Sequence, residues 1–270
     1  MQFRPQSTHI RRCFLCWAYL SRFFTGWRIS NCDEAEFPVA QAAAAGVVTL
    51  GWAGMRTIPG KDTSTAAGVH LFSHFFDANE VDSREGVEMV MEFAITSHDG
   101  AGVEIVCTPP AQLSFLTCGP QEYARGWGSE DQMSHVIRLC PAAMTLPMQM
   151  LRYGEGPQAD ENIVRFAASP RHGMRTLATV AMEAFVQAMF GLPTIQRTIS
   201  GCHRMLEDPN RPVYPGENAP SYAWLGGLAY EANVLRFWRG PEIQDILSML
   251  PQSEAVPELP WPEGVALSFR

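Results

Sequence analysis

The amino-acid sequence predicts an α+β fold that is mostly helical, arranged as a single domain with a small β-sheet. Long segments repeat apolar residues every three or four positions, which is the period of a helix with one buried face. Two short segments instead alternate apolar with polar residues and are rich in β-branched side chains, which is typical of strands. The 270 residues are enough to bury a full hydrophobic core.

The helical pattern occurs in separate segments along the chain. The first has an acidic first turn followed by an alanine-rich run, and the last follows Asn218-Ala219-Pro220. Another is strongly apolar and contains neither glycine nor proline, which indicates a buried helix interior. Because these features mark the starts and interiors of helices, we expect helices at 33–55, 69–76, 84–98, 174–190 and 221–238.

The strand pattern predicts a small sheet. We expect strands at 102–107 and 135–140, and Pro141 ends the second because proline cannot donate to a strand ladder. The segment 108–132 between them is rich in turn residues. No internal repeat divides the chain.

Both ends of the chain differ from the body, which we place at 31–239. The extension at 1–30 is basic and then apolar, which is the outline of a secretory signal, but it lacks a small-residue cleavage site. Its apolar run at 13–20 is far shorter than the ~20 residues that cross a bilayer. A signal and a helix packed on the body stay open as alternatives, and no transmembrane span is expected. The tail at 240–270 holds five prolines and is expected to wrap the surface.

Charge narrows the class of partner. Twenty basic and 28 acidic residues give a formal net charge of −8. Proteins that bind nucleic acid usually present a basic face, so nucleic acid is not an expected partner. Composition leaves the oligomeric state unknown.

Glu183 is the most unusual residue of the local sequence, because it is the one acid in the most apolar helical segment. An isolated buried charge is expensive, so this carboxylate is expected to be paired, protonated or functional. His70 and His74 have the spacing of metal ligands on a helix, but no acidic residue accompanies them at the neighbouring turn. We therefore expect them to be core or interface residues.

Four short motifs lie in a defined order along the chain. They are Asn31-Cys32, Cys107-Thr108-Pro109-Pro110, Leu139-Cys140-Pro141 and Asn218-Ala219-Pro220-Ser221-Tyr222-Ala223-Trp224. In this order and spacing they resemble the deuterolysin family of fungal zinc endopeptidases, the aspzincins, over about residues 30–238. The resemblance implies a single zincin-like domain.

The catalytic helix of that family carries the motif Thr-x-x-His-Glu-x-x-His, and the matching segment here is 179–186. Glu183 takes the position of the general base. Met182 and Val186 replace the two zinc-binding histidines. Neither side chain is a ligand for a hard N/O zinc site.

The third zinc ligand of the family is the aspartate of a Gly-Thr-x-x-Asp-x-x-Tyr-Gly motif, which matches 194–201 here. Arg197 stands at the aspartate and Ser200 at the tyrosine. A guanidinium cannot replace a carboxylate ligand, and without zinc no water is activated at neutral pH. The resemblance therefore implies a scaffold with no metal and no cofactor, and not an active zinc protease.

The resemblance also implies two disulfides, Cys32–Cys107 and Cys118–Cys140, with Cys202 outside both. Two bridges would indicate the secretory pathway, since disulfides persist in oxidising compartments. Reduced cysteines, buried as small apolar residues, would instead fit a cytoplasmic protein. The compartment stays open.

The first functional hypothesis is a metal-free enzyme of fungal secondary metabolism, acting on a small apolar substrate as a cyclase or lyase. An apolar cavity with few convergent polar groups is typical of small-molecule sites. Glu183 would be the base or hydrogen-bond acceptor, and Arg197 would polarise a substrate oxygen. Cyclisation, hetero-Diels–Alder-type cycloaddition or dehydration would suit such a site, because pericyclic chemistry mainly needs orientation. The expected substrate-binding residues are Met182, Phe185, Val186, Ser200, His203, Tyr222 and Trp224.

Two alternatives compete with this hypothesis. The chain could be a catalytically inactive pseudoprotease that holds a peptide or protein partner, which an exposed edge strand would favour. It could also lack a pocket altogether. In that case Met182 and Val186 fill the core, and Arg197 is an ordinary ion-pair partner of Glu183.

Overall fold

The computed structural model describes residues 27–64, 66–100, 102–109, 111–119, 122–128, 135–146, 176–207 and 214–230. Within these ranges helices surround one four-stranded sheet, so the predicted α+β fold is confirmed. Most of the predicted amino extension and the whole of the tail at 240–270 lie outside the described residues.

The sheet has the strand order β1 (Arg28–Ser30), β2 (Val103–Val106), β4 (His135–Leu139) and β3 (Ala124–Gly128). β1 and β4 run parallel to β2, and β3 runs antiparallel to β4. β2 and β4 are the two strands that the sequence predicts. β1 and β3 are additional, and they form the two edges of the sheet.

β1 and Trp27 belong to the body, although the sequence assigns them to the amino extension. Trp27 is 2% exposed, its indole Nε1 donates a hydrogen bond to Ser97 Oγ at 3.0 Å, and its ring lies 5.9 Å from that of Phe185. A strand of three residues is too short to show a period, and only its pairing with β2 identifies it.

β3 falls inside the segment where the sequence predicts turns, because its sequence contains two glycines. The glycines are required by packing. A Cβ at Gly126 would lie 1.8 Å from the carbonyl oxygen of Ala184, and a Cβ at Gly128 would lie 2.3 Å from that of Ala188. The backbone of β3 therefore rests directly on the backbone of a helix.

Six α-helices are described, and the predicted apolar segment is the central one of them, α6. Their bounds are α2 (Phe37–Met55), α3 (Ala66–Phe72), α4 (Val81–Gly100), α6 (Leu177–Phe190), α7 (Ile199–Glu207) and α8 (Ala219–Ala229). Short 3₁₀ helices occupy Ala111–Leu113, Pro141–Thr145 and Pro215–Glu217.

The predicted helix 221–238 begins two residues after α8 does, and its part at 231–238 lies outside the described residues. Within the described residues the predicted helices otherwise agree with these bounds to within a few residues, apart from two differences. α2 starts at Phe37 because Asp33 and Glu36 first form a capped turn, in which Asp33 Oδ1 accepts from the N–H of Glu36 and Glu36 Oε2 accepts from that of Asp33. α7 is not predicted at all.

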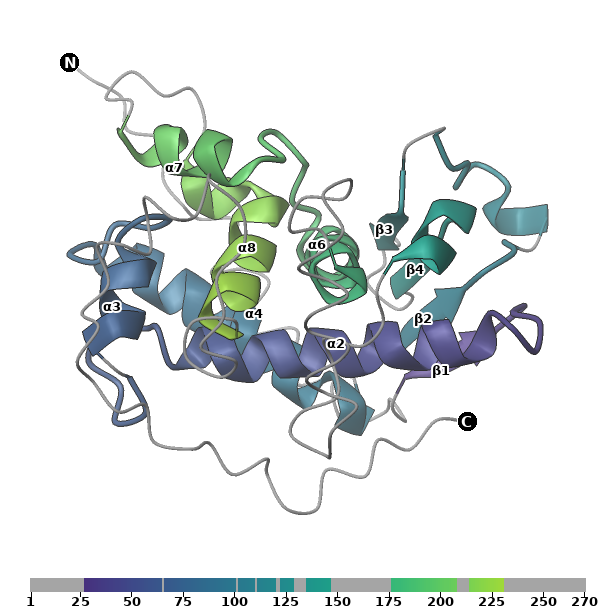
Figure 1. Cartoon of the computed structure of the whole chain (residues 1–270), viewed down its shortest axis with the longest axis horizontal. Helices are drawn as coiled ribbons and strands as arrows, with labels where there is room; N and C mark the ends of the chain where they lie inside the picture. The colour runs from purple at the N-terminus through teal and green to yellow at the C-terminus, as the bar shows by residue number, and fades with distance from the viewer. Residues whose placement is uncertain are drawn as a thin grey trace.

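α2, with 19 residues, contacts both the sheet and the helices α4, α6 and α8. It runs across the molecule in Figure 1, with the sheet over one end, α3 and α8 toward the other, and α6 between sheet and α8. α2 is long and apolar enough to cross a membrane, but 67% of its most apolar stretch is buried inside the protein. The core helix of a globular protein meets the same criterion, so among the described residues α2 is only weak evidence for a membrane span.

Both predicted disulfides are present. Cys32–Cys107 joins the chain after β1 to the chain after β2, and Cys118–Cys140 joins a loop to the end of β4. Cys202 is buried and lies outside both bridges, as expected. The two bridges thus anchor the carboxyl ends of the three neighbouring strands β1, β2 and β4.

Candidate functional site

The site is built on α6, whose first and last turns are both ended by specific capping residues. Thr176 caps the first turn through reciprocal hydrogen bonds with Thr179, and Gly191 ends the helix with a φ of 65°, which favours glycine. Most of the helix is buried. Glu183 and Gln187 are its partly exposed polar residues, one helical turn apart on the same face.

A chain of hydrogen bonds holds the Glu183 carboxylate. The backbone N–H of Gly126 donates to Gln187 Oε1 at 3.0 Å, and Gln187 Nε2 donates to Thr194 Oγ1 at 2.7 Å. The Thr194 hydroxyl then donates to Glu183 Oε1 at 2.6 Å. The chain therefore connects an edge strand to the carboxylate and fixes the carboxylate's orientation.

Glu183 lies on the wall of a small crevice between α6 and the start of α8. The crevice has a volume of about 10 Å³, which is room for one water molecule. In the described part of the chain it is thus far smaller than the cavity of several hundred Å³ that a drug-sized ligand needs. Its lining residues are Thr179, Val180, Glu183, Pro220, Ala223 and Trp224.

Asn218 fixes the loop 192–198, which contacts two residues of the crevice wall, Glu183 through Thr194 and Trp224 through Arg197. Its Oδ1 accepts from the backbone N–H groups of Ile195 at 2.9 Å and Gln196 at 3.0 Å. Its Nδ2 lies within hydrogen-bond distance of Ser221 Oγ and of the carbonyl oxygen of Gln196. Because the Asn218 side chain is fully buried, these bonds hold the loop in one conformation.

Trp224, in the wall of the crevice, holds the backbone of Arg197. Its indole Nε1 donates to the carbonyl oxygen of Arg197 at 2.8 Å, while the ring lines the crevice. Arg197 itself is exposed, and among the described residues no ion pair joins it to Glu183. The Arg197 backbone thus lies beside Trp224, and the expected convergence of the Glu183 and Arg197 side chains in one cleft stays a prediction.

The remaining predicted site residues divide into two groups. Met182, Phe185 and Val186 are fully buried in the core. Tyr222 is also buried, and its hydroxyl donates to the carbonyl oxygen of Gly216 at 2.8 Å. Burial raises the pKa of Tyr222 above its usual value, and the charge of Glu217 adds to this, so the phenol stays neutral.

Ser200 and His203 lie on α7. The side chain of Ser200 is outside the described residues. His203 Nδ1 lies 2.9 Å from the carbonyl oxygen of His74, and since a carbonyl only accepts, this nitrogen carries the hydrogen. His203 is therefore engaged with the turn after α3, and it is absent from the lining of the crevice.

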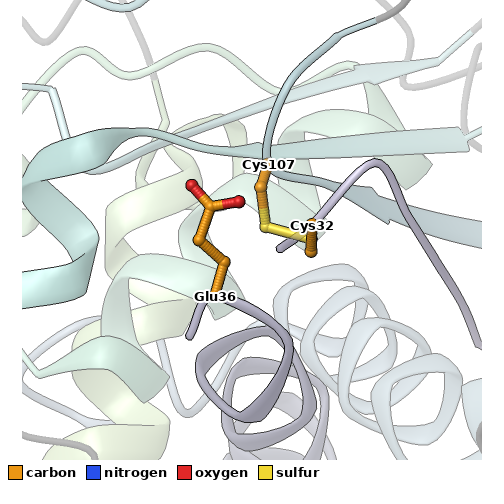
Figure 2. A group of neighbouring side chains, drawn as sticks. All are labelled: Cys32, Glu36 and Cys107. Atoms are coloured by element: carbon orange, nitrogen blue, oxygen red, sulfur yellow. A yellow bond between two sulfur atoms is a disulfide. The ribbon is translucent and has the colours of Figure 1, made fainter. Parts of the chain in front are cut away.

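A different cluster has the spacing of a metal site. Within the described ranges, Cys32, Glu36 and Cys107 are the group whose possible ligand atoms all lie within 4.8 Å of one another. Figure 2 shows the two sulfur atoms joined in a disulfide beside the Glu36 carboxylate. Since the thiolate is the metal-binding form of cysteine, the oxidised pair does not provide two metal ligands.

Sequence reasoning missed the residues that orient Glu183. Gln187 follows Glu183 by four residues on the predicted helix, a spacing at which side chains interact, and this signal was available. Thr194 lies in the segment aligned with the family motif, but its hydroxyl bond to Glu183 depends on the fold of the loop. The role of Asn218 likewise becomes visible only in three dimensions.

Comparison with known proteins gives limited information. No family model matches the chain, and no curated protein matches it. Among solved structures, a zinc peptidase from Grifola frondosa is similar, with 12% sequence identity, a TM-score of 0.48, and coverage of 73% of this chain and 96% of that chain. This likeness concerns overall shape alone, so neither the metal nor the activity of that peptidase transfers to this chain.

Proposed function

We propose that this protein is a metal-free enzyme that acts on a small apolar molecule at the Glu183 crevice, and that it is not a zinc peptidase. One observation carries the proposal. The one acid of a mostly buried helix stands on the crevice wall with its carboxylate oriented by the Thr194 hydroxyl. A polar group held in a defined orientation among apolar side chains is what small-molecule sites provide.

Zinc does not fit the residues present. On the proposed relation to deuterolysins, Met182, Val186 and Arg197 would stand at the three ligand positions. The first two are fully buried apolar side chains and the third is an exposed cation. A catalytic zinc needs three nitrogen, oxygen or sulfur ligands, and these residues supply none. No step of the proposed reaction therefore passes through a metal.

The size of the crevice determines how a substrate would bind. Room for one water molecule is room for one oxygen atom of a substrate. A carbonyl or hydroxyl oxygen would enter beside Glu183 in place of water, while the apolar body of the substrate would lie outside the crevice, because Trp224 in its wall is itself buried. Glu183 would accept the hydrogen bond or proton at its carboxylate. Arg197, on the loop 192–198, would donate to the same oxygen and polarise it.

Cyclisation, cycloaddition of the hetero-Diels–Alder type and dehydration of a polyketide or terpenoid are the reactions that such a site suits. Cycloaddition depends mainly on holding the reacting atoms in register, and fixed orientation can supply up to ~7–11 kcal/mol of the barrier. Dehydration would in addition need Glu183 as the base that removes a proton. The two disulfides support a proposed location in the secretory pathway, where such bridges persist.

The test uses charge-removing variants and a matched control. Glu183→Gln and Arg197→Met are compared with Arg204→Met, which removes an exposed arginine from the neighbouring α7. Against a panel of cyclisable polyketides and terpenoids, turnover should fall by roughly 10²–10³ in Arg197→Met, the scale of a lost oxyanion donor, with the melting temperature unchanged. Full activity in Arg197→Met, or equal losses in Arg204→Met, would remove the arginine from the mechanism.

The pseudoprotease alternative has one observation in its favour, which is that β3 forms an edge of the sheet. Peptides bind such edges as an added strand. However, the N–H of Gly126, the residue at the centre of β3, is already bound to Gln187. If the protein is a peptide binder, Gln187→Ala should free this donor and tighten peptide binding. Peptide binding by calorimetry without turnover of any small molecule would favour this alternative over the enzyme.

A further inference from the structure

Three histidine side chains meet where the turn after α3 contacts α7. The ring of His74 lies 4.9 Å from that of His70 and 5.1 Å from that of His203, centroid to centroid, both in edge-on contact. His70 belongs to α3, His74 follows that helix, and His203 belongs to α7. The cluster thus joins two elements that are far apart in the sequence.

The surroundings of the His70 and His74 rings suit their neutral forms, whereas His203 Nε2 lies 3.4 Å from Glu207 Oε1 within its own helix. His203 Nδ1–H donates to the carbonyl oxygen of His74 at 2.9 Å, which ties α7 to the turn. The Nε2 atoms of His70 and His74 are buried, and in the described part of the chain neither has a hydrogen-bond partner. A proton added to either atom would therefore be a buried donor without an acceptor, and such a group is costly.

Burial and the two neighbouring histidines oppose protonation of His74. Among the described residues, the ionisable groups that act on it are His70 from α3 and His203 and Glu207 from α7. Burial first, and then the neighbouring His203 and His70, lower the pKa of His74 to about 4, against the opposing effect of Glu207. Glu207 offsets little because its side chain is 63% exposed.

We propose that the cluster of His70, His74 and His203 is an acid-sensitive contact, which releases α7 from α3 as the pH falls and so loosens the loop that carries Thr194 and Arg197. The loop ends at Thr198, directly before α7. Release of α7 would change the position of Arg197 and of the hydroxyl that orients Glu183. The effect on the site rests on the proposed function, whereas the release of α7 does not.

The direction of the pH effect follows from proton linkage. In the released state His74 regains its ordinary pKa of 6.5, and in the docked state the pKa is about 4. The released state therefore binds more protons between these values, so the docked state loses stability as the pH falls from 6.5 toward 4. Above 6.5 the contact is at full strength.

Hydrogen exchange of the full chain tests this without any substrate, so that its failure is distinct from failure of the proposed function. Amide protection factors, corrected for intrinsic exchange, are measured at about pH 7 and about pH 5, on either side of the ordinary histidine pKa. Protection of the α7 amides should fall about tenfold or more, while that of the α6 amides stays constant. Equal protection of α7 at both values would overturn the proposal.

Variants identify the responsible group. His74→Phe keeps an aromatic ring in contact but cannot be protonated, so α7 protection should become independent of pH. His74→Gln serves the same purpose if the phenylalanine variant does not fold. Glu207→Gln removes the one favourable charge and should increase the loss at acid pH. A pH-dependent loss in both His74 variants equal to that of the unmodified protein would contradict the assignment.

Discussion

The two sides of α6 are held by different kinds of force. On the side of the sheet, the helix backbone touches the backbone of β3 at Gly126 and Gly128. Two disulfides also cross-link the chain at the strand ends. On the side of α8, hydrogen bonds to the side chains of Glu183 and Asn218 hold the loop that ends before α7. Where backbones are in direct contact or cross-linked, a substitution forces the backbone to move. A loop held by side-chain hydrogen bonds can instead change its conformation when one of those side chains is replaced. The first side is suited to a scaffold and the second to a site.

The largest effect is expected at Gly126. In Gly126→Ala the new Cβ would overlap the carbonyl oxygen of Ala184, so β3 or α6 must move. Overpacking usually costs ~1–3 kcal/mol and occasionally more, and because backbone must shift we expect a loss above ~3 kcal/mol by urea unfolding. Gly86→Ala is the matched control, since its Cβ meets open space in α4, and it should stabilise by up to ~1 kcal/mol. Equal stability of the two variants would refute rigid packing on this side.

Removal of the longer disulfide comes next. The bridge Cys32–Cys107 closes a separation of 75 residues, and loss of such a cross-link typically costs ~2–4 kcal/mol. We expect this loss in the double serine variant, measured by urea unfolding against the oxidised parent. Reduction of the parent protein breaks both bridges, so it should lower the stability further than this variant does. A variant as stable as the parent would show that the sheet side does not depend on this bond.

On the α8 side, Asn218→Ala should have the largest effect. It removes a buried side chain whose oxygen accepts from the N–H groups of Ile195 and Gln196 and whose nitrogen binds Gln196 and Ser221, and each such hydrogen bond contributes ~0.5–1.5 kcal/mol net. We expect a loss of about 3 kcal/mol together with increased proteolysis of the loop. Asn79→Ala, at an exposed turn, should change stability by less than ~0.5 kcal/mol. If the loop keeps its protection, Asn218 does not hold it.

Thr194→Val should have the smallest effect. It replaces the hydroxyl that links Gln187 to Glu183 with a methyl group. Hydrogen bonds to charged groups contribute ~1.5–3 kcal/mol, but because the site is partly exposed we expect ~1–2 kcal/mol. Thr194→Ser keeps the hydroxyl and should restore most of the stability. Identical unfolding curves for the valine and serine variants would show that the chain of hydrogen bonds is not formed in solution.

The same contrast explains which parts of the fold the sequence predicts. α6 and α4 have long periodic patterns, and their predicted positions are correct to within a few residues. β2 and β4 are rich in β-branched residues and mostly buried, so their positions too are predictable from the sequence. β3 is missed because its glycines serve contact with α6, which has no local signature.

The site is less predictable than the fold for a physical reason. The acid Glu183 stands out in the sequence because a charge in an apolar helix is costly. Its partner Thr194 lies on the loop after the helix, and Gly126, which donates to Gln187, lies on a strand 61 residues before Gln187. Both hydrogen bonds therefore depend on how the loop and the strand are placed. α7 is missed because its pattern is short and interrupted by Gly201.

The central claim, that the Glu183 crevice works without metal, is tested most directly by native mass spectrometry of the folded protein after exposure to zinc. The same measurement on His74→Phe serves as a control for zinc bound at the histidine cluster. We predict the mass of the metal-free chain in both proteins, since Met182, Val186 and Arg197 offer no zinc ligand. One zinc ion per chain that survives buffer exchange in both proteins would contradict the account.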